Sequence, residues 1–573
     1  MNEKISYGLD LYSIEKSLAA GGPGSVFEPY DKLEWLKKSY NDPEEFWTNL
    51  LITRNSFFPW AAKSIPFKKY DFYHDIIVCS RPGKMPALRW FDMFSGWKEI
   101  SYSDLEIQAG QMAYLWKNSG VSPGQTICII HPLGEKFIIS LLAGLKLGLI
   151  ISHILPQGRS YLEKRLEMLA PDHIASDSIY TSMIVQWKDR ILNQSFVFKE
   201  ISADIDQSYS YRSGDTVFKC FDPSSITPHI PVDINADFSY LCPMRDGIIG
   251  LGLRPGNIYA APGFHFSETQ PALVLSGLLT GAAFLHLEQE RIFDNPEILT
   301  NCPLKAIGIN QRIRDFLIQN PIEIGNLWKF WFRNPAESSD MDKWHSFIHR
   351  LKLDNVLAGN LKWEPVSGGC SLFSIKHTGM ADVNVLPSAG VKWGLADMAD
   401  TSMEALGEFG VLCLESFDKD SKAKTVLADI ITKNRDQWIF TGSNLSGKAG
   451  RHYPLEEVLE LINNKMPGIC CTIVQVPGEP VFDLIIFTGT KDTNEPELIK
   501  SIYNIIEKEL GREFIPDRIK IFPYYPRCDQ NGNTDHHWCQ SQYITGGLNK
   551  KSKNEIYQYI SRIRESLFDF NSP

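Results

Sequence analysis

The chain has 573 residues, of which 43% are hydrophobic and 22% are charged, and its net charge is -10. A single hydrophobic core stops growing at roughly 250–300 residues, so this length predicts two or three domains. The negative charge, without a long basic run, argues against nucleic acid or an anionic membrane as the main partner. The 11 cysteines are scattered without a CxxC pair, which favours reduced thiols over a disulfide framework.

The first part of the chain, residues 1–75, predicts a leader that packs on the domain after it. Its opening residues lack the apolar core of a signal peptide, so we expect a cytoplasmic protein. The Asp-Pro-Glu-Glu stretch that begins at Asp42 indicates a helix start, because proline suits the first turn and acids there face the positive helix end.

From residue 100 onward, helix and strand patterns alternate with short links. Apolar residues at helical spacing predict a helix over 101–119 that ends at Gly120. The TICII stretch, residues 126–130, predicts a short buried strand. Further units follow the same order, including a helix over 268–281 and a strand over 282–288. Such alternation indicates an α/β domain with a mostly parallel sheet.

The most apolar run of the sequence is Phe137–Leu155. Its length would allow a membrane span, but Lys146 lies in its middle and Gly144 and Gly148 flank that lysine. We therefore expect a buried helix, a glycine turn and a buried strand, and no membrane span.

The last part of the chain has a different pattern. Helical runs at 453–465 and 495–510 enclose a pair of apolar strand patterns, and a further strand pattern follows at 517–523. This order predicts a small α+β domain that begins near 441–450. A short helical pattern, residues 554–567, closes the chain.

Several stretches, in this order, resemble the adenylate-forming superfamily of acyl-CoA synthetases, peptide-synthetase adenylation domains and luciferases. Residues 254–266, RPGNIYAAPGFHF, are similar to its "R-P-G-D-x…P-L-F-H" segment. Residues 449–462, AGRHYPLEEVLELI, are similar to "G-x-x-I-Y-P-x-E-V-E-x-x-L". The tail at 513–533 resembles the segment that ends in "P-R-T-x-S-G-K". The resemblance covers about residues 35–545.

This resemblance implies a fold of two domains after the leader. We expect a large α/β domain with mostly parallel sheets over residues 76–440, and a small α+β C-terminal domain over 441–573. In the family, the large domain binds ATP and a carboxylic acid and forms an acyl-AMP. The acyl group then passes to a thiol, usually CoA or a carrier pantetheine. ATP with Mg²⁺, CoA or phosphopantetheine, and a carrier protein are the cofactors and partners that the resemblance implies.

The triphosphate loop of the family is eroded in this sequence. Its position corresponds to Phe221–Ile234, which has Ser224, Ser225 and Thr227 but neither glycine nor lysine. Three prolines stand there instead, and proline removes the N–H groups that would bind phosphate. This segment is a poor phosphate cradle.

The metal-binding "G-Y-G-x-T-E" motif is best matched by Ser367–Ser374, SGGCSLFS, in which Leu372 and Phe373 replace Thr-Glu. The carboxylate is missing in this alignment. An alternative alignment uses Asp382 of HTGMAD as the acid. The preceding "G-G-x-P-L" motif is altered as well, to RNPAE at Arg333–Glu337.

Two further family residues concern the nucleotide. Asp429 of VLAD corresponds to the aspartate that holds the ribose hydroxyls, and its alternative role is to cap a loop. Asn533 stands where the family has its C-terminal lysine. Removing one such preorganised donor typically costs about 10²–10³ in rate. The phosphate loop, the metal-binding acid and the C-terminal lysine are all altered. These changes together predict a chain that no longer adenylates in the standard way.

The resemblance gives four candidate contacts for an acyl group: His265, Gly368, Gly369 and Cys370. His265 occupies the family's pocket-wall position, and its alternative role is structural. Cys370 would act as a nucleophile only with a base nearby. Cys528, His536 and Cys539 are metal-binding residue types, but their spacing matches no common zinc finger, so no metal site is predicted.

These patterns leave three hypotheses for function. The first is a divergent acyl-CoA synthetase or AMP-ligase homologue that handles an acyl or aryl group, free or as a thioester, in a biosynthetic pathway. The second is an active acid-thiol ligase with unusual ATP contacts. The third is a non-catalytic scaffold or regulator of a related synthetase.

Overall fold

The computed structural model describes residues 6–7, 39, 42–58, 68–77, 85–92, 96–192, 208–222, 229–337, 340–379, 381, 383–398, 400–415, 424–434, 437–443, 453–475, 481–490, 493–529 and 534–569. Its internal contacts divide the chain into two compact units. The first comprises Met1–Pro156 and Arg165–Leu445, and the second comprises Gln157–Lys164 and Ser446–Pro573.

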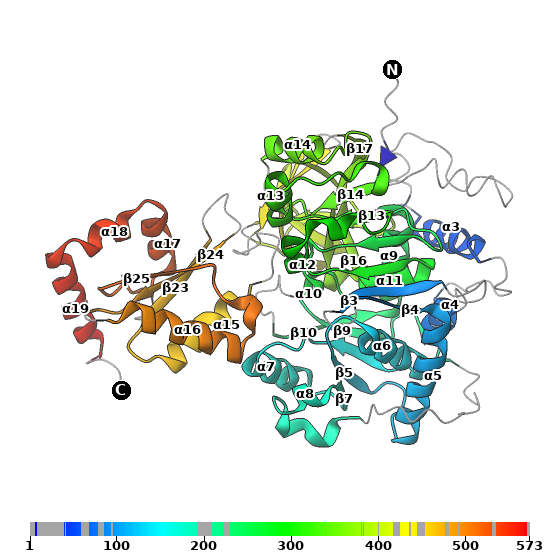
Figure 1. Cartoon of the computed structure of the whole chain (residues 1–573), viewed down its shortest axis with the longest axis horizontal. Coiled ribbons are helices and arrows are strands. Elements are labelled where there is room, and N and C mark those ends of the chain that lie inside the picture. The colour runs from blue at the N-terminus through cyan, green and yellow to red at the C-terminus, as the bar shows by residue number, and fades with distance from the viewer. Residues whose placement is uncertain are drawn as a thin grey trace. The chain divides into compact units, whose positions relative to one another are not determined.

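The first unit is built on a 15-stranded sheet that is largely parallel in one half and antiparallel in the other, and Figure 1 labels several of its strands. The strand order is β19-β20-β21-β22-β18-β16-β15-β14-β13-β11-β12-β3-β4, with β1 and β17 off this path. Strands from β3 to β15 along this order pair in parallel, whereas the strands from β15 to β19 pair antiparallel. The bounds are β1 Ser6–Tyr7, β3 Pro86–Asp92, β4 Gly96–Ser101, β11 Ile258–Ala260, β12 Ala283–His286, β13 Ala306–Gly308, β14 Phe330–Arg333, β15 Leu357–Glu364, β16 Gly369–Phe373, β17 Ile375–Thr378, β18 Asn384–Pro387, β19 Trp393–Ala396, β20 Phe409–Glu415, β21 Lys424–Asn434 and β22 Gln437–Ser443.

A second sheet of the same unit has five strands in the order β10-β9-β6-β5-β7. Strands β5, β6, β7 and β9 pair in parallel, and β10 closes one edge antiparallel to β9. All five residues of β5 are buried, which confirms the strand predicted from TICII. The bounds are β5 Thr126–Ile130, β6 Ile150–His153, β7 His173–Ser176, β9 Thr216–Phe221 and β10 Pro231–Asn235, with a separate two-stranded ribbon of β2 Lys69–Tyr70 and β8 Tyr211–Arg212.

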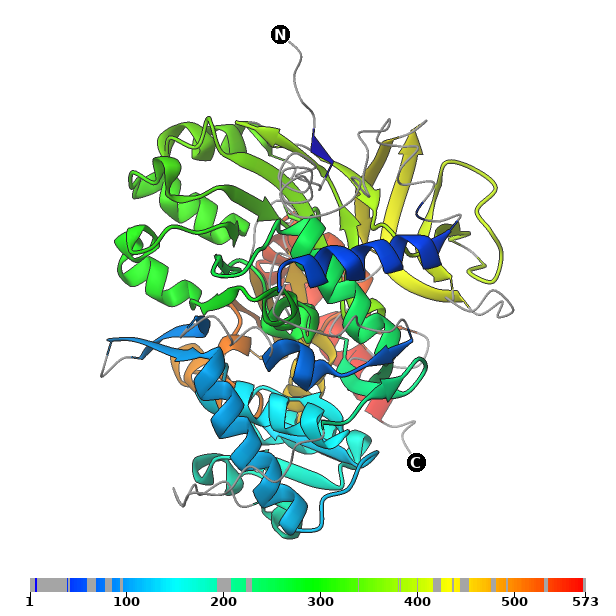
Figure 2. The ribbon, with the colours of Figure 1, turned by 90° about the vertical axis from the view of Figure 1, so that its right-hand side faces the viewer.

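The helices of the first unit, of which α7 belongs to it only from Arg165 onward, flank these sheets, and Figure 2 shows the long helix α5. The predicted helix starts are confirmed at α3, where Asp42 caps the N-terminus, and at α5, where Ser101 does so. The bounds are α3 Pro43–Ser56, α4 Phe72–Ile77, α5 Tyr102–Asn118, α6 Glu135–Leu147, α7 Arg159–Leu169, α8 Ser178–Thr181, α9 Ala236–Arg245, α10 Phe266–Thr269, α11 Ala272–Thr280, α12 Gln289–Asp294, α13 Gln311–Gln319 and α14 Met341–Arg350. Shorter turns are η2 Val185–Arg190, η3 Asp246–Gly250, η4 Pro296–Thr300, η5 Gly325–Leu327 and η6 Pro365–Ser367.

The apolar run Phe137–Leu155 forms the predicted helix, turn and strand. Helix α6 ends at Gly148, which has a φ of 76° and directs the chain into β6. Glycine tolerates this left-handed conformation without the steric cost that other residues meet. In the part of the chain that the structure describes, no helix has the length and apolar character that a membrane crossing requires.

The second unit contains a three-stranded sheet with the order β23-β24-β25. Strands β23 Cys470–Gln475 and β24 Phe482–Phe487 pair antiparallel, and β25 Arg518–Phe522 runs parallel to β24. The predicted helices and strands of this part are confirmed. The helices are α15 Leu455–Lys465, α16 Glu495–Glu509, α17 His536–Ile544, α18 Gly547–Ser552 and α19 Glu555–Asp569, with the turn η7 Arg512–Phe514.

Two elements differ from the sequence-based expectation. The helix predicted over 268–281 is two helices, α10 and α11, because Pro271 between them has no N–H for helical bonding. Helices α17 and α18 were not predicted. Asp535 caps α17 by accepting a hydrogen bond from the Trp538 amide. Cys539 of α17 and Leu548 of α18 are buried in the hydrophobic core of the second unit.

Candidate functional site

Four neighbouring parallel strands of the large sheet end next to polar side chains. His265 follows β11, Asn310 follows β13, Glu337 follows β14, and Glu364 is the last residue of β15. In open α/β sheets, ligands bind outside the carboxyl ends of the strands. This edge, which we call the carboxyl edge, is therefore the candidate functional site of the first unit.

His265 caps the short helix α10 with its own side chain. Its Nδ1 accepts a hydrogen bond from the Ser267 amide at 3.3 Å. The flanking phenylalanines are buried, as expected for core residues. Phe266 packs against the rings of His153 and Phe137, with centroids 5.1 and 5.5 Å away. This residue therefore joins α10 to the smaller sheet.

Phe264 lies on the other side of His265 and forms an aromatic cluster with the large sheet. Its ring centroid is 5.2 Å from that of Phe332 and 5.4 Å from that of Trp363. Phe332 and Trp363 also touch, at 5.6 Å. Residues of three strands or their ends thus build an apolar wall beside His265.

Glu337 is a buried carboxyl group at the end of β14. One carboxylate oxygen accepts a hydrogen bond from the Gln311 amide at 2.9 Å, at the start of α13. The other, Oε1, has no hydrogen-bond partner among the described residues. Burial raises the pKa of Glu337 to about 7, and Glu268 acts in the same direction, while the Gln311 amide and Arg333 oppose it.

The end of β15 holds a buried ion-paired cluster of three side chains. The ammonium of Lys362 contacts the carboxylate of Glu364 on the same strand and the carboxylate of Asp429 on β21. The exposed fractions are 1% for Lys362, 3% for Glu364 and 0% for Asp429. Burial alone would lower the pKa of Lys362, but the two carboxylates outweigh it and hold this pKa above its usual value.

Asp429, the predicted ribose contact, is thus engaged inside the protein. Its carboxylate is fully buried and pairs with Lys362. No sequence pattern links this pair, because Lys362 lies on β15 and Asp429 on β21, which are far apart along the chain. A ribose would have to displace the Lys362 ammonium to reach Asp429.

Gly368, Gly369 and Cys370 lie where β16 approaches helix α9. Gly368 has a φ of 63°, and a Cβ added at Gly369 would lie 2.6 Å from Asp246 Oδ2 and 2.7 Å from Cys242 Cβ. Two glycines therefore permit a close approach between backbone and helix, which gives them a packing role.

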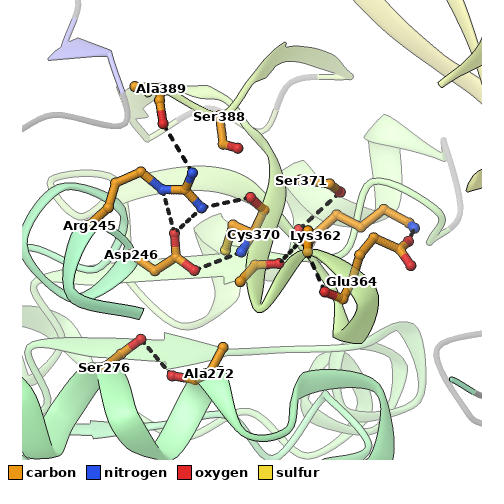
Figure 3. A network of polar contacts seen from close by, with 12 residues as sticks. Arg245, Asp246, Ala272, Ser276, Lys362, Glu364, Cys370, Ser371, Ser388 and Ala389 are labelled. Carbon is orange, nitrogen blue, oxygen red and sulfur yellow. Dashed lines mark hydrogen bonds and ion pairs between the residues drawn. The ribbon is translucent and has the colours of Figure 1, made fainter. Parts of the chain in front are cut away.

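Cys370 belongs to a buried polar network with Arg245 and Asp246 (Figure 3). Its amide donates to Asp246 Oδ2 at 2.6 Å, and its carbonyl accepts from Arg245 at 2.8 Å. Arg245 also pairs with Asp246 and donates to the Ala389 carbonyl. Burial raises the pKa of the Cys370 thiol well above its usual range, so this sulfur is not an activated thiolate.

Glu364 is a buried carboxylate at the carboxyl edge that the motif match in the sequence did not single out. The motif "G-Y-G-x-T-E" was matched to residues 367–374, which form η6 and the buried strand β16. The preceding stretch Gly359–Glu364, GNLKWE, has the same first and last residues as the motif and ends at the carboxyl edge. The spacing from Gly359 to Glu364 equals that of the motif, and it is the sequence signal that points to Glu364.

Other predicted residues lie elsewhere. Asn533 and Asp382 are outside the described residues, as are 223–228 of the phosphate-loop segment. His536 lies on α17, where its Nδ1 is 2.8 Å from the Thr472 hydroxyl, and Cys539 is buried in the core of the second unit. Within the described ranges, no three His, Cys, Asp or Glu side chains are grouped to hold a metal ion.

The carboxylates at the end of β15 do not fit a bound Mg²⁺. This ion takes carboxylate and water oxygens in near-octahedral geometry at about 2.0–2.1 Å. The place between Glu364 and Asp429 is filled by an ammonium group instead. A metal ion there would have to displace Lys362.

Comparisons with known proteins address the fold. No family model matches the chain, and no curated protein matches it. Solved structures do match. An acetoacetyl-CoA synthetase from Streptomyces lividans matches with a TM-score of 0.60 and 12% identity, over 97% of this chain and 98% of that one. An amide bond synthetase from Marinactinospora thermotolerans matches with a TM-score of 0.64 and 13% identity, over 83% and 100%.

A third structure is a fatty acyl-adenylate ligase from L. pneumophila, in complex with acyl adenylate and pyrophosphate. It matches with a TM-score of 0.59 and 13% identity, over 83% of this chain and 96% of that one. The similarity spans nearly the whole length of all three enzymes. At these identities it establishes the architecture, which agrees with the mixed α/β sheets and the smaller second unit. The chain has the fold of the adenylate-forming, acyl-CoA synthetase-like enzymes.

Proposed function

We propose that this protein is a divergent homologue of the acyl-CoA synthetases that handles an acyl or aryl group without standard ATP-dependent adenylation. The group is bound free or as a thioester of CoA or a carrier protein, in a biosynthetic pathway. The observation that carries this proposal is the buried pair of Lys362 and Asp429. In this pair, Lys362 engages the carboxylate of Asp429, which the family resemblance assigns to the ribose.

The sequence supports the same conclusion from two other positions. The phosphate-loop segment has no glycine or lysine, and Asn533 replaces the family's lysine. The first change weakens the binding of the triphosphate. The second removes a positive charge that would stabilise the negative charge developing in the transition state. Losses at three separate contacts are harder to compensate than a loss at one.

The acyl side of the carboxyl edge is better preserved. His265 retains its family position, and Phe264, Phe332 and Trp363 form a buried aromatic wall beside it. Small-molecule sites are mostly apolar with a few polar groups that orient the ligand. An acyl or aryl chain suits this wall better than a nucleotide does.

Calorimetric titration of the purified protein with Mg-ATP and with acyl-CoA thioesters tests the proposal. We expect no saturable ATP binding up to about 1 mM, and binding of at least one acyl- or aryl-CoA that Trp363→Ala weakens about tenfold, or about 1.4 kcal/mol. Micromolar ATP binding that Asp429→Asn abolishes would contradict the proposal. Asp315→Asn, a substitution at a partly buried aspartate on α13, is the matched control.

The second candidate is an active acid-thiol ligase with unusual ATP contacts. The observation that favours it is the presence of two buried carboxylates on one ammonium, Glu364 at the carboxyl edge and Asp429 on β21. The two candidate functions differ in pyrophosphate, which only the active ligase releases from ATP. An acid that triggers pyrophosphate release from ATP, at a rate reduced by Asp429→Asn, would establish the ligase.

A further inference from the structure

The cluster at the end of β15 contains its own counter-ion. Two carboxylates carry two negative charges, and the Lys362 ammonium lies against both of them. Figure 3 shows the Lys362 and Glu364 side chains lying side by side, with the ammonium turned toward the carboxylate. All three side chains are buried, so water screens their interaction little.

We propose that the Lys362 ammonium is a built-in cation, which takes the place of a divalent metal ion between Glu364 and Asp429. The carboxyl edge then binds its ligand without Mg²⁺. The proposal rests on the proposed function for the nature of that ligand. The exclusion of Mg²⁺ does not depend on the proposed function, since it rests on Lys362, Glu364 and Asp429 alone.

Charge and space both support this assignment. The Lys362 ammonium neutralises one of the two carboxylate charges, and it would repel a second cation placed at the same point at close range. Mg²⁺ also keeps several waters when it binds to protein carboxylates. Asp429 is fully buried, so a metal ion there would have to carry these waters into the interior.

The position of the lysine is fixed by the strand that carries it. Lys362 is two residues before Glu364 on β15, and alternate residues of a strand point to the same face. Trp363, between them, packs instead on Phe264 and Phe332. The strand therefore places the side chains of Lys362 and Glu364 on the same face, where the ammonium contacts the carboxylate.

Titration with Mn²⁺ alone, followed by electron paramagnetic resonance and thermal unfolding, tests the proposal. We expect the wild-type protein to show no saturable Mn²⁺ site up to about 1 mM and the same Tm in MnCl₂ and in EDTA. Lys362→Ala removes the ammonium and leaves both carboxylates. This variant should bind one Mn²⁺ per chain, with a Tm about 2–4 °C higher in MnCl₂ than in EDTA.

Two further variants complete the experiment. Lys362→Ala/Glu364→Gln lacks one of the two carboxylates and should lose the Mn²⁺ site of Lys362→Ala. Lys362→Arg keeps the cation and should behave as the wild type does. A Lys362→Ala chain that folds and binds no Mn²⁺ would overturn the proposal.

The wild-type protein decides the question if Lys362→Ala does not fold. A wild-type Mn²⁺ site that Glu364→Gln removes would overturn the built-in cation, and the absence of any wild-type site supports it. Failure here is distinct from failure of the proposed function. ATP binding without a metal site would contradict the function and leave the cation in place, and a metal site without ATP binding would do the reverse.

Discussion

Lys362 occupies a position where charge is costly unless it is paired. Removing one member of a buried ion pair typically costs about 3–5 kcal/mol, because the partner is left as an uncompensated charge. In this protein the loss would leave two carboxylates, Glu364 and Asp429, without their shared ammonium. The residue therefore matters for the fold as well as for the site.

We predict that Lys362→Met lowers the free energy of unfolding by about 3–5 kcal/mol. Urea denaturation, followed by circular dichroism, measures the change. Lys343→Met, at a lysine whose side chain is 53% exposed, is the control and should stay within about 0.5 kcal/mol of wild type. Lys362→Met/Asp429→Asn should lose less than the sum of its single substitutions, since the two residues interact. Equal effects of Lys362→Met and Lys343→Met would contradict the buried pair.

Glu337 provides a pH-dependent prediction. Its pKa is about 7 in the folded protein, above the usual value, because burial disfavours the carboxylate. The folded state therefore holds this proton more tightly than the unfolded state does. Stability is lost as the pH rises from about 4.5 to about 7, by roughly 3 kcal/mol in total.

Glu337→Gln removes this charge and keeps an acceptor for the Gln311 amide. We expect the variant to match the wild type near pH 4.5 and to be more stable than it by about 2–3 kcal/mol at pH 8. Urea midpoints between pH 4.5 and 8 measure the difference. Glu290→Gln, at an exposed glutamate, is the control and should show no such divergence. Parallel pH profiles for wild type and Glu337→Gln would refute a neutral Glu337.

At the scale of elements, the contact between β16 and α9 depends on two glycines and the Arg245–Asp246 pair. A Cβ at Gly369 would lie 2.6 Å from Asp246 Oδ2, which is closer than real contacts allow. We predict that Gly369→Ala costs about 1–3 kcal/mol, since a packed interior relaxes poorly around added volume. Gly407→Ala, which meets nothing within 4 Å, is the matched control. Denaturation midpoints compare the two, and equal midpoints would mean that α9 and β16 adjust freely.

The elements that sequence predicted well are those with local signals. Helix α5 has a serine cap, a helical repeat of apolar residues and a glycine just after its end. Helix α6 and strand β6 follow from one apolar run with a glycine turn. These signals lie within a few residues of the structure that they determine.

The candidate site was predicted less completely because its contacts join distant strands. Asp429 was identified through a motif, but its partner Lys362 belongs to β15, and no local pattern links the two strands. Glu364 lies just before residues 367–374, which match the motif best, so that match does not point to it. His265 was found at the carboxyl edge, whereas its capping of α10 follows from geometry that the sequence does not contain.

At the scale of the molecule, the division into two units predicts two unfolding transitions. Each unit has buried apolar residues of its own, with Ile307 in the first and Ile485 in the second, both fully buried. Domains with separate cores can unfold separately, in which case a single unfolding free energy is not defined. Truncating a buried isoleucine typically costs about 2–5 kcal/mol. Calorimetry of the whole chain should therefore show two transitions, with Ile307→Ala lowering the Tm of one and Ile485→Ala lowering the Tm of the other.

Two exposed isoleucines supply the matched controls for this experiment. Ile179 in the first unit is 70% exposed and Ile556 in the second is 71% exposed, so truncation of either should leave both transitions in place. A single transition in the wild type, or an equal shift of both transitions by one core variant, would show that the units unfold together. In that case the small unit would stabilise the large one, and substitutions such as Lys362→Met would have to be interpreted for the whole chain.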